Sequence, residues 1–364
     1  MTRRGGGYLG GMDISAISGT ATGLIDDALD RFVVLGYTKI GSRLRRQWWP
    51  ADPAPQSMAG KRVVVTGATA GIGEAMAQSF AELGATVHLL GRNEERVRRS
   101  AAKVRGTVPA AVVIEEVCDV SDLDAVRAWT DDLAARIPAL HGLVHNAGAL
   151  LKERGVTPQG HEVQLASHVL GPHLITERLL PLLRAAGGSS VVFMSSGGMY
   201  SSGLVDDDLE YRSGSYNGVR AYARTKKMQV VLADAWARRL AGTGAAGPAT
   251  SSSGAAGPAT SSSDIRVESM HPGWVETPGV AESLPTFRTI TRPLLRDARD
   301  GADTAVWLVA TRPDSKPGHF WHDRAQRPTT FGWQRDEDPA KIRHFLQQVS
   351  EMTGTSADWG ALRR

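Results

Sequence analysis

The sequence predicts an α/β fold, a doubly wound parallel sheet of about seven strands with helices on both faces. Two observations predict this fold class. Short runs rich in β-branched residues alternate with longer segments of helical periodicity over residues 61–321. The first run leads directly into a glycine-rich turn and a helix, as expected where a parallel sheet binds a nucleotide. We therefore interpret the 364-residue chain as a single domain with an N-terminal extension.

We divide the chain into three parts. Residues 1–57 form the N-terminal extension, residues 58–336 the catalytic domain, and residues 337–364 a C-terminal helical tail. Within the domain, residues 242–263 contain one ten-residue sequence twice, Gly-Ala-Ala-Gly-Pro-Ala-Thr-Ser-Ser-Ser. Because these small residues offer no hydrophobic face for stacking, we expect a disordered surface insertion there.

The N-terminal extension is expected to begin as a flexible Gly-, Ser- and Thr-rich stretch and to continue as an amphipathic basic helical arm. Between residues 26 and 49, apolar side chains recur at helical intervals and are accompanied by arginines and lysines. Such an arm either makes peripheral contact with an anionic membrane or packs on the protein or a second subunit. Gly36 and Gly41 weaken a long helix, and we favour packing on the protein.

The composition excludes several classes of function. Lys and Arg exceed Asp and Glu by 42 to 38, and this weak net charge of +4 gives no reason to expect a nucleic acid partner. Cys118 is the single cysteine, so neither a disulfide framework nor a cysteine metal cluster is expected, in keeping with a cytoplasmic protein. No apolar run long enough for a transmembrane helix and no convincing signal peptide is present.

The alternation of patterns assigns each strand and helix. The expected strands are 62–65, 86–90, 111–117, 142–145, 190–194, 265–270 and 318–321. The expected helices are 74–83, 93–104, 121–136, 160–186, 221–241 and 297–310. Pro172 and Pro181 should kink or break the fourth of these helices. Ligands are then expected at the carboxyl ends of the strands.

The turn after the first strand has glycines at positions 67, 71 and 73, in the spacing Gly-x3-Gly-x-Gly. Glycine adopts positive φ without strain, and its missing Cβ lets a pyrophosphate approach the backbone. The phosphates would lie at the N-terminus of the next helix, where free N–H groups favour an anion. The turn predicts dinucleotide binding, with a purely structural turn as the alternative.

Three further features follow strands of the predicted sheet. Asn146-Ala147-Gly148 ends the fourth strand, and Ser195-Ser196 ends the fifth. Tyr222 and Lys226 are four residues apart, on one face of the helix before the sixth strand. A lysine charge lowers the pKa of a neighbouring phenol, which makes tyrosine a general acid/base, and a serine hydroxyl opposite would bind the substrate oxygen.

This ordered set resembles the short-chain dehydrogenase/reductase family over about residues 61–324. The resemblance implies a Rossmann-type fold and hydride transfer between a nicotinamide coenzyme and a small-molecule carbonyl or alcohol. It implies that Tyr222 is the general acid/base, that Ser196 positions the substrate oxygen, and that Lys226 binds the nicotinamide ribose. We choose Ser196 over Ser195 because the catalytic serine of the family is the last residue of that pair.

The resemblance also implies which residues contact the coenzyme. Residues 271–277 resemble the loop over the nicotinamide, and Asp119 matches the acidic residue beside the adenine. The predicted contacts are Thr66, Gly67, Thr69, Gly71, Ile72, Gly73, Arg92, Asp119, Val120, Asn146, Ala147, Gly148, Tyr222, Lys226, Pro272, Gly273, Val275 and Thr277. No metal ligand set is predicted.

Longer matches narrow the resemblance. Residues 195–199 and 271–279 are similar to the branch called dehydrogenase/reductase family member twelve, whose members also carry an N-terminal extension. In the family, the helices that correspond to 160–186 and 221–241 often form a dimer contact. A homodimer or homotetramer is therefore an open expectation.

One position departs from the family pattern. The family has a catalytic asparagine on the long helix, which holds a water that passes protons to the lysine, and this sequence has His168 there. Histidine is both donor and acceptor near neutral pH and is therefore a candidate proton relay. The alternative is that His168 only fills the space, and the sequence leaves both interpretations open.

The end of the second strand bears on the choice of coenzyme. An NAD enzyme typically has a carboxylate there for the ribose 2′-hydroxyl, and Gly91 supplies none. Arg92 could pair instead with the 2′-phosphate of NADP, because its planar fork fits a phosphate. The sequence therefore favours NADP(H) over NAD(H), which remains the alternative.

The substrate is expected to be lipophilic. A lid over residues 278–296 carries an apolar inner face, and four side chains should approach from the other side: Met199, Tyr200, Leu204 and Tyr216. The alternative is that these side chains only pack the lid on the core. A second interpretation of the whole chain is a nucleotide-binding regulatory or scaffold protein on the same fold, with weak or no turnover.

Overall fold

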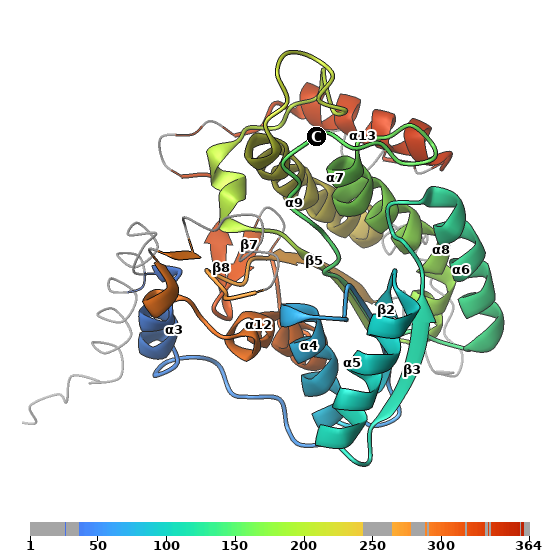
Figure 1. The fold of residues 1–364 in the computed structure, drawn as a ribbon, viewed down its shortest axis with the longest axis vertical. Helices are drawn as coiled ribbons and strands as arrows, with labels where there is room; N and C mark the ends of the chain where they lie inside the picture. The colour runs from blue at the N-terminus through green and yellow to red at the C-terminus, as the bar shows by residue number, and fades with distance from the viewer. Residues whose placement is uncertain are drawn as a thin grey trace, which may run out of the picture.

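The computed structural model describes residue 26 and residues 36–242, 264–277, 288–289, 291–316, 319–331, 334, 336–356 and 358–359. These residues form a three-layer α/β fold, with helices on both faces of a central sheet (Figure 1). Three parts of the prediction lie outside the described residues: most of the N-terminal extension, the duplicated insertion from residue 243, and the lid residues Val280, Leu284, Phe287 and Ile290.

The sheet has the strand order β3-β2-β1-β4-β5-β6-β7-β8. Its strands are β1 Arg62–Thr66, β2 Thr86–Gly91, β3 Val112–Val117, β4 Gly142–His145, β5 Ser189–Met194, β6 Ile265–Met270, β7 His319–His322 and β8 Ala325–Pro328. Strands β1 to β7 pair in parallel, and β8 is antiparallel to β7. The order reverses between β1 and β4, where a doubly wound sheet opens a crevice at its carboxyl edge.

The parallel α/β fold class is confirmed, and β8 is an additional edge strand. Asp323 and Arg324 make the turn into β8 with φ of 51° and 55°. The sequence of β8, Ala-Gln-Arg-Pro, has none of the β-branched or aromatic residues typical of strands, and its proline is tolerated only at an edge. The strand therefore forms because the turn places it beside β7.

The helices with at least two turns alternate with the strands as predicted. They are α4 Gly71–Glu82, α5 Glu94–Thr107, α6 Leu123–Arg136, α8 Gly171–Ala185, α9 Gly218–Gly242, α12 Ala298–Thr311 and α13 Pro339–Thr353. Shorter helical pieces are α3 Lys39–Arg45, α7 Val163–Leu165, η2 Gly197–Ser201 and η3 Arg292–Leu294. Helices α4, α5 and α12 pack on one face of the sheet, and α6, α8 and α9 on the other.

The helix predicted over residues 160–186 is divided near Pro172, as expected, whereas Pro181 lies inside α8 without ending it. Glu162 caps α7 by accepting hydrogen bonds from the backbone N–H groups of Gln164 and Leu165. A π-helical turn, η1 Ala166–Leu170, then leads into α8, and the N–H of Gly171 donates to the carbonyl of Ala166 five residues back. Proline at the second position of α8 has no N–H to donate, which disrupts the regular pattern of i→i−4 bonds at this place.

The C-terminal helix packs on the face of the molecule that α8 and α9 form. Phe345, Leu346 and Val349 of α13 belong to the same apolar core as α6, α8 and α9. His173 of α8 hydrogen-bonds Thr355 at 2.9 Å. Within the described residues, no helix is long and apolar enough to cross a membrane.

Candidate active site

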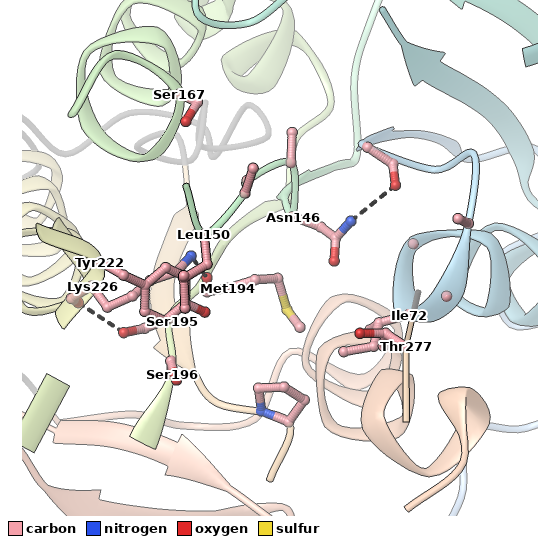
Figure 2. Close-up of a pocket in the computed structure, with 18 of the residues that line it drawn as sticks. Ile72, Asn146, Leu150, Ser167, Met194, Ser195, Ser196, Tyr222, Lys226 and Thr277 are labelled. Carbon is pink, nitrogen blue, oxygen red and sulfur yellow. Dashed lines mark hydrogen bonds between the residues drawn. The ribbon is translucent and has the colours of Figure 1, made fainter. Parts of the chain in front are cut away.

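One cavity of about 620 Å³ lies at the carboxyl edge of the sheet and collects most of the predicted site residues. Figure 2 shows Tyr222, Lys226 and Ser196 on one side of it, with Ile72 and Thr277 opposite and Asn146 between them. The residues come from the ends of β1 to β6 and from the start of α4 and α9. The crevice that strand order predicts is therefore the place where these side chains meet.

The glycine turn leaves room for a phosphate next to the backbone. Gly67 and Gly71 have φ of 65° and 54°, and a Cβ on Gly73 would lie 2.3 Å from the carbonyl oxygen of Gly67. No side chain caps α4, whose N-cap residue is Ala70, so its first N–H groups face the cavity without a capping partner. An uncapped helix N-terminus with small residues fits a dinucleotide pyrophosphate.

Asn146 connects the ends of β4 and β1. Its Nδ2 donates to the carbonyl oxygens of Thr66 and Gly67, at 2.9 and 3.2 Å. Thr66 does not line the cavity, contrary to our expectation of a coenzyme contact. Its hydroxyl accepts hydrogen bonds from the N–H groups of Asn146 and Ala147. Thr66 therefore fixes the turn after β4 from outside the cavity.

The two neighbouring serines have different partners. The hydroxyl of Ser195 donates to the backbone carbonyl of Lys226 at 2.8 Å and thereby ties β5 to α9. The hydroxyl of Ser196 accepts from the N–H of Gly198 at 3.1 Å and also hydrogen-bonds the Tyr222 phenol. Because the Ser195 hydroxyl is paired with a backbone carbonyl and Ser196 interacts with the phenol, Ser196 is the serine placed to share a substrate oxygen with Tyr222.

The pKa of the Tyr222 phenol is higher than the sequence predicts. Burial raises the pKa of Tyr222, and the hydrogen bond with Ser196 lowers it without reversing the shift. The Lys226 amine lies 5.4 Å from the centroid of the Tyr222 ring. The pKa of the phenol is therefore raised and not lowered as the sequence predicts, because desolvation of the phenol dominates.

Lys226 is buried and held by two acceptors. Its Nζ donates to the carbonyl of Met194 and to Oε1 of Gln229, each at 2.9 Å. Burial lowers the pKa of Lys226 to about 7. An ammonium has three protons, so one remains for a ribose hydroxyl in the cavity. Gln229 was not among the predicted site residues, although its position three residues after Lys226 places it on the same helix face.

His168 does not line the cavity, although its ring contacts Tyr222. It is fully buried in the π-helical turn, and its ring packs edge-on against Tyr222 with centroids 5.5 Å apart. Its Nδ1 lies 2.8 Å from the hydroxyl of Thr225, which itself donates to the carbonyl of Tyr222. Because that hydroxyl has one proton, Nδ1 must be the donor, and Nε2 is left bare.

The bare Nε2 of His168 faces Gly148. A Cβ on Gly148 would lie 2.4 Å from it, and Nε2 has no hydrogen-bond partner among the described residues. Burial and then the charge of Lys226 hold the pKa of His168 well below its usual range. The ring is thus neutral, and glycine at 148 is required to make room for it.

The end of β2 presents a cation and no carboxylate. Arg92 is exposed and lines the cavity. A Cβ on Gly91 would lie 2.4 Å from the methyl group of Thr69 and 3.0 Å from that of Val97. There is therefore no room at position 91 for the acidic side chain that typically binds the ribose of NAD.

The wall beyond β3 contains Cys118 and Asp119. One oxygen of Asp119 accepts from the N–H and the hydroxyl of Ser121, at 2.9 and 2.7 Å, which orients the carboxylate at the cavity. Burial, and then the charges of Asp119 and Asp122, raise the pKa of the Cys118 thiol to about 12. Across the described ranges, no group of three or more His, Cys, Asp or Glu side chains could hold a metal ion.

Apart from Thr66 and His168, the structure brings every predicted site residue to the cavity. They are Gly67, Thr69, Gly71, Ile72, Gly73, Arg92, Asp119, Val120, Asn146, Ala147, Gly148, Ser196, Tyr222, Lys226, Pro272, Gly273, Val275 and Thr277.

The substrate wall differs from our expectation. The described lining contains none of Met199, Tyr200, Leu204 and Tyr216. Met199 and Leu204 are buried in the core, and the Tyr216 hydroxyl donates to Glu162 at 2.9 Å. Apolar side chains that do line the cavity are Leu150, Val163, Met194, Val219 and Trp274.

Comparison with known proteins agrees with this geometry. The family model for short chain dehydrogenase matches residues 61–205. Bovine "Dehydrogenase/reductase SDR family member 12" is 31% identical over 319 residues, which are 87% of this chain and 93% of that protein. Mouse "Polyprenol dehydrogenase" is 31% identical over 84% of this chain and 88% of its own length.

A solved structure shows the same fold. The short chain dehydrogenase from Salmonella enterica subsp. enterica serovar Typhi is similar to this chain with a TM-score of 0.54 and 26% identity. The match covers 77% of this chain and 98% of that chain. The similarity thus extends beyond the glycine turn to most of the sheet and its helices.

Proposed function

We propose a specific reaction for this chain, which belongs to the short-chain dehydrogenase/reductase family, a family of NAD(P)-dependent oxidoreductases. The reaction is the NADP(H)-dependent interconversion of a lipophilic carbonyl compound and its alcohol, with Tyr222 as general acid/base. The observation that carries the proposal is that Tyr222, Ser196 and Lys226 line the same cavity as the glycine turn.

Tyr222 supplies the proton in carbonyl reduction. Because burial raises its pKa, the phenol is protonated at neutral pH and can donate to the oxygen of the developing alkoxide. Ser196 hydrogen-bonds the phenol and holds the same substrate oxygen. When bound, the coenzyme supplies the hydride. The third proton of Lys226 binds the nicotinamide ribose, and the charge of Lys226 stabilises the tyrosinate that forms.

Two observations at the end of β2 support NADP(H). The exposed Arg92 lines the cavity, and it has no ion pair with another described side chain. Position 91 has no space for a competing carboxylate, because Thr69 and Val97 fill it. Arginine binds phosphate through a planar, bidentate fork, so Arg92 would bind the 2′-phosphate.

The substrate wall supports a lipophilic carbonyl compound. Val219 lies one turn before Tyr222 on α9 and is 53% exposed, so an apolar surface borders the catalytic phenol. Leu150, Val163 and Trp274 line the same cavity. A relative with 31% identity is called polyprenol dehydrogenase, and its named substrate is a long lipid alcohol.

A substrate screen tests the proposal. The purified full chain is mixed with NADPH or NADH and with pairs of long-chain and short, polar aldehydes and ketones, and the nicotinamide absorbance is followed. We expect turnover with NADPH and faster turnover of the long-chain member of each pair. A preference for the polar members would contradict the substrate class, and a preference for NADH would contradict the coenzyme.

The alternative, a nucleotide-binding regulatory or scaffold protein, draws support from one observation. His168 stands where the family has a catalytic asparagine, and its Nε2 has no partner within the described part of the chain. Coenzyme binding in a fluorescence titration, without turnover across the whole panel, would favour that alternative.

A further inference from the structure

We propose that the N-terminal segment, residues 36–45, helps to form the active site and that Tyr37 is a positioning residue for the loop at residues 271–277. Tyr37 is only 4% exposed, although it precedes the first strand of the sheet. The inference rests on the proposed function, because the position of the loop at residues 271–277 matters only if a coenzyme binds beneath it.

The carbonyl oxygen of Tyr37 holds this loop. It accepts hydrogen bonds from the backbone N–H of Trp274 at 2.8 Å and from Nε of Arg296 at 3.0 Å. The backbone of Arg296 in turn pairs with Trp274 and Glu276, at 2.8 and 2.9 Å. Residues 37, 274 and 296 thus form one ladder, and Tyr37 is its outer member.

The ring of Tyr37 lies between the loop and the catalytic serine. Its centroid is 4.4 Å from that of His271, the residue before Pro272. A Cβ on Gly197 would lie 2.4 Å from Cε2 of the same ring, and Gly197 directly follows Ser196. One aromatic ring therefore sets the separation between the serine turn and the coenzyme loop.

A close approach at Gly273 shows how tightly the loop and the segment fit. Gly273 has φ of 78°, and a Cβ there would lie 2.6 Å from the Arg296 guanidinium and 2.7 Å from the carbonyl oxygen of Tyr37. A displaced Tyr37 would leave this left-handed turn without the contacts that fix it.

A buried ion cluster, Arg45, Arg296 and Asp323, anchors the segment. Arg45 Nη1 and Arg296 Nη2 lie 3.0 and 2.9 Å from Oδ2 of Asp323, and all three side chains are at most 3% exposed. Both guanidinium groups also donate to the carbonyl oxygen of Gly36, at 3.3 and 2.9 Å. Asp26 supplies a second carboxylate, 2.6 Å from Arg45 Nε.

The charges in this cluster make the segment hard to displace. Two buried guanidinium groups share Asp323, so the carbonyl oxygens of residues 36 and 37 supply acceptors that one carboxylate cannot. Detachment of the segment would leave these donors unpaired in the protein interior. The cluster therefore keeps Tyr37 in place, and Tyr37 keeps the loop in place.

The test compares a whole coenzyme with its adenosine half. Isothermal titration measures the Kd of the coenzyme that the wild type prefers, and of 2′,5′-ADP or ADP, which lacks the nicotinamide. Full-length Tyr37→Ala keeps the backbone carbonyl and loses the ring that packs against His271 and Gly197, so the loop should be held less firmly. We expect Kd for the coenzyme to rise about tenfold, with Kd for the adenosine half unchanged. Ile40→Ala is the matched control, since Ile40 lies in α3 of the same segment and is 48% exposed.

Hydrogen exchange gives a reading that needs no coenzyme. In Tyr37→Ala, exchange should accelerate in residues 271–277 and 195–201 and stay unchanged in residues 66–73. If the wild type binds neither coenzyme, the proposed function fails and exchange alone decides the positioning role. Tyr37→Leu, which retains apolar volume, replaces Tyr37→Ala if that variant does not fold. Equal changes in both Kd values, or unchanged exchange in residues 271–277, would overturn the proposal.

Discussion

The cavity has two halves that are built in different ways. The glycine-turn half, residues 62–148, takes its wall from consecutive strands and the turns that follow them. The catalytic half, residues 189–328, is completed from a distance, because the carbonyl of Tyr37 and the side chain of Arg45 fix its loop and its edge strand. A substitution in the first half should therefore act through one local contact, and one in the second half through several segments.

Apart from the loss of the Tyr222 hydroxyl, the largest effect is expected within the catalytic half, between two adjacent serines. Ser196→Ala removes the hydroxyl that contacts Tyr222, and turnover should fall about a hundredfold with little change in stability. Ser195→Ala removes the bond to the Lys226 carbonyl, and the free energy of unfolding should fall by about 1 kcal/mol with a smaller loss of turnover. Steady-state rates measure turnover and urea unfolding measures stability. A larger loss of turnover in Ser195→Ala than in Ser196→Ala would contradict the roles assigned to the two serines.

In the glycine-turn half, Arg92→Ala should act on one ligand only. Loss of a charge-assisted contact to the 2′-phosphate should weaken NADPH binding about ten- to a hundredfold and leave NADH binding unchanged. Fluorescence titration with both coenzymes measures this, and Arg98→Ala on the exposed face of α5 is the matched control. Equal weakening of NADPH and NADH would rule out phosphate recognition by Arg92.

Substitutions of Gln229 test whether a residue outside the cavity affects coenzyme binding through its hydrogen bond with Lys226. Gln229→Leu removes an acceptor of the buried ammonium, so coenzyme affinity should fall about tenfold and the pKa of Lys226 should fall below 7. Gln229→Glu should restore the affinity, since a carboxylate raises that pKa. The pH dependence of coenzyme binding measures both the affinity and the pKa of Lys226. An identical profile in the wild type, Gln229→Leu and Gln229→Glu would exclude a role of Gln229 in holding Lys226.

The last predicted effect is on stability and not on activity, and it is the pH dependence of the free energy of unfolding. Burial lowers the pKa of Lys226 to about 7 in the folded protein from its usual 10.5. Between these values the unfolded chain binds more protons, so stability rises with pH. Relative to Lys226→Met, the wild type should gain roughly 2 kcal/mol between pH 7 and 9 in urea unfolding. A flat difference would show that Lys226 stays charged in the coenzyme-free protein.

The difference between the two halves also explains how much of the fold and of the site the sequence predicts. The bounds of β1, β2 and β4 agree with the prediction to within one residue, because a buried strand that ends at glycine or Asn-Ala-Gly is a local pattern. Except for Thr66 and His168, the predicted site residues meet at the cavity for the same reason.

What sequence patterns did not reveal depends on long-range contacts. The polar edge strand β8 forms only because β7 is beside it, and Tyr37 reaches the site only because Arg45 pairs with Asp323. The break near Pro172 was predicted, but the π-helical form of the turn around His168 was not. The raised pKa of Tyr222 depends on burial, which no spacing rule reports.

The central claim is that Tyr222 is the general acid/base in the cavity that binds the coenzyme. Its most direct test is a single-turnover measurement on Tyr222→Phe at saturating NADPH. The account predicts that hydride transfer slows about a thousandfold or more, while Kd for NADPH stays within about twofold of the wild type. Tyr211→Phe is the control, because it removes a buried hydroxyl outside the cavity that has no partner among the described residues. Wild-type rates in Tyr222→Phe would contradict the account.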